Sequence, residues 1–104
     1  MNVLNQCFVK ETSCVTREIV GETIIVPIKN RVGDLGSIYT VNEVGTMIWQ
    51  LIDGHREVRQ IADAVYETFD VEPTAAEKDT IEFLESLENA GLIHPATDDR
   101  HVGP

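Results

Sequence analysis

Residues 39–54 have the sequence Tyr-Thr-Val-Asn-Glu-Val-Gly-Thr-Met-Ile-Trp-Gln-Leu-Ile-Asp-Gly and contain a change of periodicity. Before this stretch apolar residues alternate as in strands, and from Val44 onward they recur with helical spacing. Asn42 precedes the helix, where its side-chain oxygen can accept an N–H of the first turn. Gly54 follows it and can adopt the left-handed conformation that ends helices. The sequence therefore predicts a sheet before this stretch and helices after it. The apolar face of this first helix comprises Val44, Met47, Ile48, Leu51 and Ile52.

The segment before this stretch predicts three short strands. Residues 15–20 and 23–29 are rich in β-branched residues and predict a hairpin. Its tight turn is expected at Gly21-Glu22, because glycine favours turns. Residues 30–36, with two glycines and an aspartate, predict a loop of the kind called a wing. Residues 37–41 then form the third strand.

The segment after this stretch predicts two more helices. Apolar residues recur with helical spacing over residues 58–69. The third helix covers residues 73–88, with a proline in its first turn, and Gly91 ends it. Strands clustered before helices favour an α+β fold, winged-helix-like, with a three-stranded antiparallel sheet followed by three helices. The predicted organisation is an N-terminal arm (1–14), one domain (15–93) and a flexible tail (94–104).

Composition and charge restrict the classes of partner. A chain of 104 residues that is 42% hydrophobic suffices for one domain with one core. The apolar runs are too short to cross a bilayer, and the N-terminus lacks a signal-peptide pattern, so we expect a cytoplasmic protein. The net charge of −10 disfavours nucleic acid and anionic membranes, whose phosphates it would repel. It favours neutral or basic partners.

The chain contains no recognisable catalytic or metal-ligating constellation. Cys7 and Cys14 are separated by six residues and have no nearby histidine, which fits neither a zinc site nor a redox pair. His55, His94 and His101 are not spaced with a nucleophile or carboxylate in a catalytic pattern. We therefore expect no enzyme activity, no metal and no cofactor.

An ordered set of residues resembles a known family. The first stretch carries the set Tyr39-x-Val41-Asn42-Glu43-x-Gly45-x-x-Ile48-Trp49-x-Leu51-Ile52-Asp53-Gly54. Later stretches carry Val58-x-x-Ile61, Val65 and Phe83-Leu84-x-x-Leu87-x-x-x-Gly91-Leu92-Ile93. Together they resemble the signature of the PqqD family over residues 15–93. The longer loop at 30–36 and the acidic charge depart from that pattern, so a role in pyrroloquinoline quinone (PQQ) biosynthesis does not follow.

The resemblance implies a peptide chaperone. Members of the PqqD family bind the leader segment of a ribosomally made precursor peptide. They present the rest of that peptide to a modifying enzyme, often a radical SAM enzyme. The partners implied here are therefore a leader peptide and a radical SAM or other peptide-modifying enzyme.

The resemblance also implies a site at the edge of the sheet. An extended peptide can pair with an exposed edge strand, and side-chain pockets beside the edge then supply specificity. The family places this edge at the third strand, and the third helix forms the wall beside it. The strand residues are Ser37, Ile38, Tyr39, Thr40 and Val41, and the helix residues are Lys78, Ile81, Glu82 and Glu85. If the acidic helix contributes, it favours a basic or neutral leader.

Other interpretations of these residues stay open. Ile38 and Val41 can equally be core residues, and Trp49 is better explained as core filling than as ligand stacking. A second function class is an adaptor or self-associating module, a homodimer formed through the same open edge. A third is a winged-helix DNA-binding regulator. The second helix offers only Arg59 and the third only Lys78 for phosphates, which disfavours that class.

Overall fold

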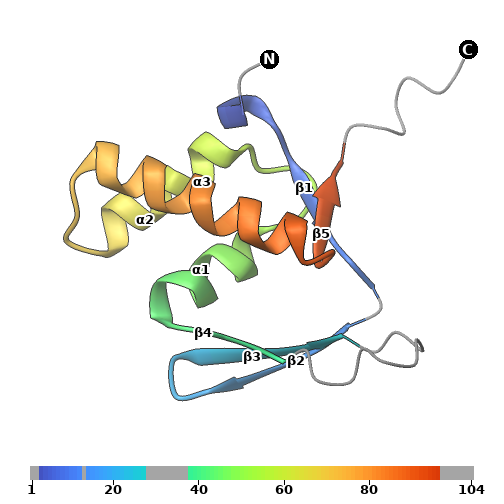
Figure 1. The fold of residues 1–104 in the computed structure, drawn as a ribbon. Coiled ribbons are helices and arrows are strands. Elements are labelled where there is room, and N and C mark those ends of the chain that lie inside the picture. The colour runs from blue at the N-terminus through green and yellow to red at the C-terminus, as the bar shows by residue number, and fades with distance from the viewer. Residues whose placement is uncertain (1–2, 13, 28–37, 97–104) are drawn as a thin grey trace, which may run out of the picture.

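The computed structural model describes residues 3–12, 14–27 and 38–96. In chain order the elements are η1 (Val3–Asn5), β1 (Phe8–Lys10), β2 (Cys14–Ile19), β3 (Glu22–Pro27), β4 (Tyr39–Val41), α1 (Glu43–Leu51), α2 (Val58–Thr68), α3 (Pro73–Asn89) and β5 (Ile93–Pro95). The antiparallel sheet β2-β3-β4 lies beneath the three helices (Figure 1). This arrangement confirms the predicted α+β fold. The predicted loop over 30–36 lies outside the described residues, as do Ser37 and the tail beyond residue 96.

The hairpin of β2 and β3 has its turn one residue earlier than the sequence predicted. Ile19 pairs with Glu22, so Val20 and Gly21 form the turn. The φ angles of these two residues are 44° and 83°. Two successive positive φ angles define the type I′ turn, whose twist matches that of the flanking strands. Gly21 adopts this conformation without steric cost, whereas Val20, a β-branched residue, does not.

One face of the sheet packs on the helices. Thr23, Ile25 and Val41 are buried on this face. The register places Val41 opposite Thr23, as expected for residues whose side chains share one face. The hydroxyl of Thr23 donates a hydrogen bond to that of Thr46 on α1, with 2.9 Å between the oxygens. Two buried polar groups thereby satisfy each other and hold α1 on the sheet.

The three helices enclose a single core. Oδ1 of Asn42 accepts the backbone N–H of Gly45 at 2.9 Å, as predicted for the cap of α1. Trp49 is 3% exposed and belongs to the core, which agrees with its interpretation as a filling residue. The other buried apolar residues of the helices are Ile48, Val58, Ile61, Ala62, Val65, Ala76, Leu84 and Leu87.

The two ends of the described chain form a second, two-stranded sheet. β1 pairs antiparallel with β5, with Phe8 opposite Pro95 and Lys10 opposite Ile93. The prediction that 94 and 95 belong to a flexible tail was therefore wrong. Part of the expected N-terminal arm is likewise integral to the fold, because Phe8 is 4% exposed and belongs to the core. Burial of this phenylalanine ring supplies the physical reason for docking β1.

The turn between α1 and α2 is organised by Asp53. Its Oδ1 accepts the backbone N–H groups of His55 and Arg56, each at 2.9 Å. Oδ2 lies 2.8 Å from the Arg56 guanidinium. The two backbone hydrogen bonds are the main cause of a lowered pKa for the Asp53 carboxyl group, and the charges of Arg56 and His55 lower that pKa further.

We expect Asp53→Asn to change how stability depends on pH. A carboxylate with a lowered folded-state pKa stabilises the fold above its unfolded pKa, about 3.9, and loses that contribution as pH falls through the folded value. The wild type should therefore exceed the variant in unfolding free energy at pH 6, by less than about 1 kcal/mol because the side chain is 39% exposed. The difference should vanish toward pH 2. Urea unfolding at both pH values measures it, and an equal difference at both would contradict this account.

Candidate functional site

β4 is an edge strand. It pairs with β3 on one side, and within the described residues no strand pairs with its other side. In an antiparallel sheet, alternate residues direct their N–H and C=O groups toward or away from the neighbouring strand. The free side of β4 therefore presents backbone groups that an extended chain can meet.

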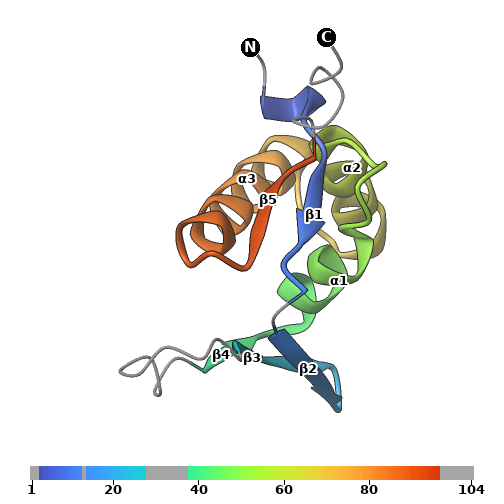
Figure 2. The ribbon, with the colours of Figure 1, turned by 90° about the vertical axis from the view of Figure 1, so that its right-hand side faces the viewer.

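α1 and α3 converge on β4 at Gly45. A Cβ atom added to Gly45 would lie 3.0 Å from Cζ of Phe83 and 3.0 Å from Cβ of Val41. Glycine at this position therefore allows α1 to approach both α3 and β4 closely. In Figure 2, α3 and β4 lie toward the left of the molecule and α1 lies to the right of both.

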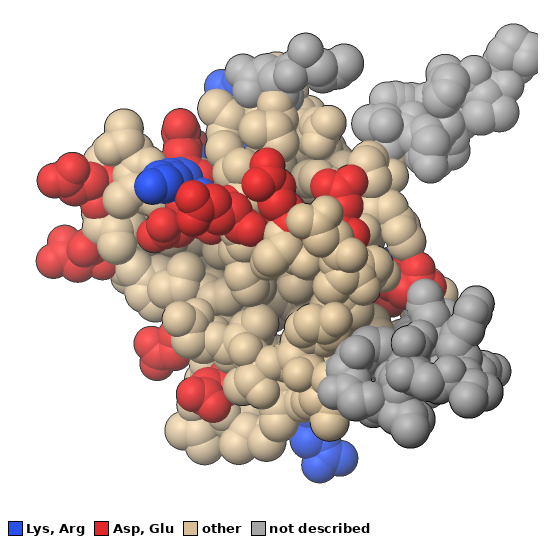
Figure 3. All heavy atoms as spheres, viewed as in Figure 1, with Lys and Arg blue, Asp and Glu red and all other residues tan. Residues whose placement is uncertain are grey.

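A cavity of about 250 Å³ lies at this convergence. Its lining combines apolar and polar side chains, and the residues are Asn42, Val44, Gly45, Ile48, Asp79 and Phe83. The cavity therefore offers apolar side chains together with the Asn42 amide and the Asp79 carboxylate. In space-filling view the surface between α3 and the sheet is largely uncharged, and acidic side chains follow α3 above it (Figure 3). We call the free side of β4 together with this cavity the edge site.

The predicted strand residues occupy different environments at the edge site. Ile38, immediately before β4, is 60% exposed, so the core interpretation does not hold for it. Val41 is 8% exposed and faces the core. Thr40 is exposed, and Tyr39 is partly buried against the core. Ile38 and Thr40 are thus the described strand residues whose side chains are accessible.

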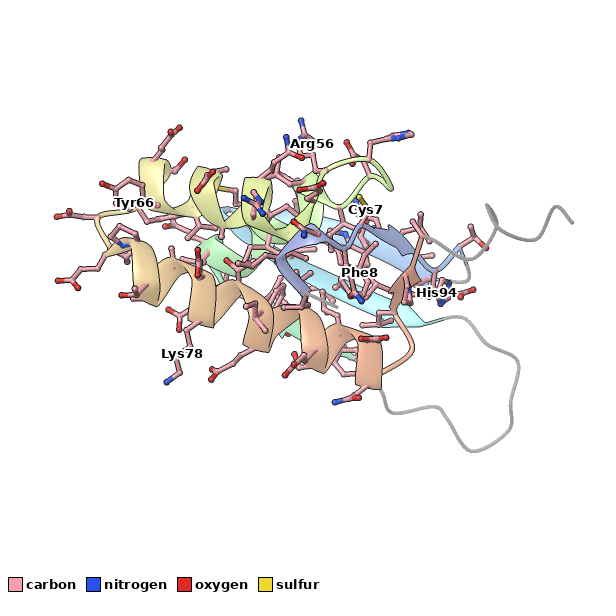
Figure 4. The ribbon with its side chains drawn as sticks, turned by 90° about the horizontal axis from the view of Figure 1, so that it is seen from above. Cys7, Phe8, Arg56, Tyr66, Lys78 and His94 are labelled. Carbon is pink, nitrogen blue, oxygen red and sulfur yellow. The ribbon has the colours of Figure 1, made fainter. Side chains whose placement is uncertain are left out.

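The predicted helix residues do not line the cavity. Lys78, Glu82 and Glu85 are exposed and Ile81 is partly buried. The side chain of Lys78 extends away from the body of the protein (Figure 4), and its Nζ lies 4.0 Å from a carboxylate oxygen of Glu82.

Asp79 and Phe83 of α3 line the cavity instead. They are four residues apart and therefore share one face of the helix. These two residues were not predicted as site residues from the sequence, and neither were Asn42, Val44 and Ile48. The available signal was Gly45, because a glycine inside an amphipathic helix indicates a close neighbour, and Phe83 is the large apolar residue flanking the core stripe of α3.

The described part of the chain has no metal-binding cluster, disulfide or membrane-spanning helix. It contains no group of three or more histidine, cysteine or acidic residues that can hold a metal ion. Cys7 and Cys14 are not joined in a disulfide. None of the described helices combines the length and hydropathy that crossing a membrane requires.

Comparisons with known proteins identify the family and similar folds. A family model described as coenzyme PQQ synthesis protein D (PqqD) matches residues 22–93. The fold is similar to that of a solved TbiB1 in complex with the TbiA(beta) leader peptide, with a TM-score of 0.70 and 23% identity over 83% of this chain and 94% of that one. It is also similar to a lasso peptide synthetase B1 complexed with the leader peptide, with a TM-score of 0.70 and 18% identity over 85% of this chain and 98% of that one. No curated protein matches the sequence significantly.

Proposed function

Because the chain belongs to the PqqD family, we propose that it binds the leader segment of a ribosomally made precursor peptide at the edge site. It then presents the rest of the peptide to a separate modifying enzyme, a radical SAM or other peptide-modifying enzyme. The observation that carries the proposal is the free side of β4 lying beside a cavity between α1 and α3. Both structural relatives were solved with leader peptides bound.

Backbone pairing and side-chain burial both contribute to the free energy of peptide binding. A three-residue strand offers roughly two to four hydrogen bonds on its free side, each contributing about 0.5–1.5 kcal/mol net. Their sum falls below the ~8 kcal/mol that a micromolar dissociation constant requires. An apolar side chain buried in the cavity adds about 1.5–3 kcal/mol. The cavity is therefore needed for affinity as well as for selectivity.

Charge selects among leaders. Asp79 lines the cavity, and Glu82 and Glu85 are exposed on the same helix. A leader with Lys or Arg beside its buried apolar residue gains from these carboxylates, whereas an acidic leader is repelled. The residues of the proposed site are thus Ile38, Tyr39, Thr40 and Val41 with Asp79 and Phe83, and the exposed carboxylates of α3 act at longer range. In this proposal the chain supplies recognition and the modifying enzyme supplies the chemistry.

An NMR titration tests the proposal. The probe is the leader segment of a precursor peptide encoded near this gene, added to the ¹⁵N-labelled protein. We expect saturable shifts for the amides of residues 38–41, Gly45, Asp79 and Phe83. Light scattering at each concentration separates peptide binding from self-association through the open edge. Saturable shifts confined to surfaces away from these residues would contradict the assignment of the site.

A further inference from the structure

A second cavity adjoins the edge site. It has a volume of about 360 Å³ and is lined by Val20, Glu22, Asn42, Glu43, Val44 and Phe69. Asn42 and Val44 also line the first cavity, so both cavities border the start of α1. The β2–β3 turn, the start of α1 and the α2–α3 connection lie at the same end of the molecule (Figure 1).

Val20 lies at the tip of the hairpin, and valine is an unexpected choice there if the position serves folding alone. It is 96% exposed, so its side chain contributes nothing to the core. Its φ angle of 44° is a true outlier for a β-branched residue. Asparagine, aspartate or glycine would suit the first position of this turn better. Strained residues of this kind concentrate at binding sites, where the exposed side chain is used.

The backbone next to Val20 holds the tip against α1. A Cβ atom added to Gly21 would lie 3.3 Å from both Cγ and Oε2 of Glu43. The hairpin tip and the first residue of α1 are therefore close neighbours, and together they form one wall of the second cavity. Phe69, at the end of α2, is partly buried on the core and contributes an apolar surface to the lining.

We propose that the second cavity is a further side-chain subsite for the same peptide and that Val20 is a specificity-determining residue. The inference rests on the proposed function. Thr23 pairs with Val41, so Val20 and Glu22 lie on the β3 side of β4, away from its free side. A peptide paired with the free side of β4 would therefore reach them by continuing past Val41 and crossing the start of α1 at Asn42 and Val44, which line both cavities. The occupant is an apolar residue of that peptide, packed between Val20, Val44 and Phe69.

Charge defines the neighbours of this apolar residue. Glu22 and Glu43 line the cavity, and its lining includes no lysine or arginine. A peptide residue with a positive charge therefore fits beside the apolar one, and an acidic residue is excluded. The subsite thus recognises an apolar peptide residue adjacent to Lys or Arg, at a fixed distance along the peptide from the segment that pairs with β4.

Val20→Asn is the decisive variant, because it creates Asn-Gly, the preferred pair for this turn. The variant should have an unchanged or higher urea midpoint. The probe is a fluorescein-labelled peptide selected by the wild-type protein from a displayed library of random peptides. We expect its dissociation constant to rise about fivefold, the factor for roughly one lost methyl-sized contact. Val15→Thr removes an apolar side chain that is 53% exposed but lines neither cavity, and it should bind as the wild type does.

The selected sequences provide the second readout. The wild type should select peptides that carry an apolar residue beside Lys or Arg, outside the segment that pairs with β4. Val20→Asn should lose this preference and still select the same residues within the pairing segment. Equal affinity and equal preference in the two proteins would overturn the subsite while leaving the edge site in place. Failure of the wild type to select any peptide would overturn the proposed function and the subsite with it.

Discussion

Proline at position 39 or 40 is expected to lower leader-peptide affinity by up to about tenfold in one of the two variants. Successive residues of β4 direct their N–H groups to opposite sides, so only one of Tyr39 and Thr40 donates outward. Proline there removes a donor for the peptide and places its ring in the path of the added strand. The loss of one hydrogen bond contributes about 0.5–1.5 kcal/mol, or up to about tenfold in affinity.

Proline at the other position breaks a hydrogen bond to β3 instead, and that variant should lose unfolding free energy. Calorimetric titration with the leader peptide and urea unfolding of both proteins separate the two effects. Thr40→Val is the matched control, since it changes an exposed side chain and retains the backbone donor. Affinity unaffected by either proline would show that the peptide does not pair with β4.

Gly45→Leu is expected to abolish peptide binding by filling the first cavity. Any side chain at this position meets Phe83 and Val41 at 3.0 Å, and the longer leucine extends into the space that Gly45 lines. Overpacking costs about 1–3 kcal/mol of unfolding free energy. The better helix propensity of leucine offsets roughly 0.5–1 kcal/mol of this.

Ile61→Val is the control for the loss of stability in Gly45→Leu. Ile61 is 2% exposed on α2 and does not line the cavity, and its shortening costs a comparable ~0.5–1.5 kcal/mol. This variant should retain peptide affinity by fluorescence anisotropy. If Gly45→Leu bound the peptide as tightly as the wild type, the cavity would have no part in recognition.

Local sequence signals predicted most of the fold. Alternating and helical periodicities located the sheet and the three helices, and Asn42 marked the start of α1 as predicted. The pairing of β1 with β5 escaped prediction because each strand has three residues and their partners are more than 80 positions apart in the sequence. Such strands have no periodicity of their own and form only through tertiary packing.

The candidate site was predicted in outline and not in detail. The third strand could be placed at an edge from the family resemblance, whereas the wall residues of α3 depend on how that helix is rotated against α1. Sequence spacing shows which residues share a helical face but not which neighbour that face meets. Asp79 and Phe83 are identified by the structure, in which Gly45 leaves little room beside Phe83 and both α3 residues line the cavity. The hairpin turn was displaced by one residue because glycine can occupy either central position.

The two-stranded sheet formed by β1 and β5 has a practical consequence for protein engineering. The N–H of Ala96 donates to the carbonyl oxygen of Cys7 at 2.9 Å, so entry and exit of the described fold are adjacent. Such a unit can be spliced as a cassette into a surface loop of a host enzyme through two short linkers. The edge of β4 would stay accessible in such a chimera, and a tethered substrate would meet the host at an effective concentration on the order of millimolar.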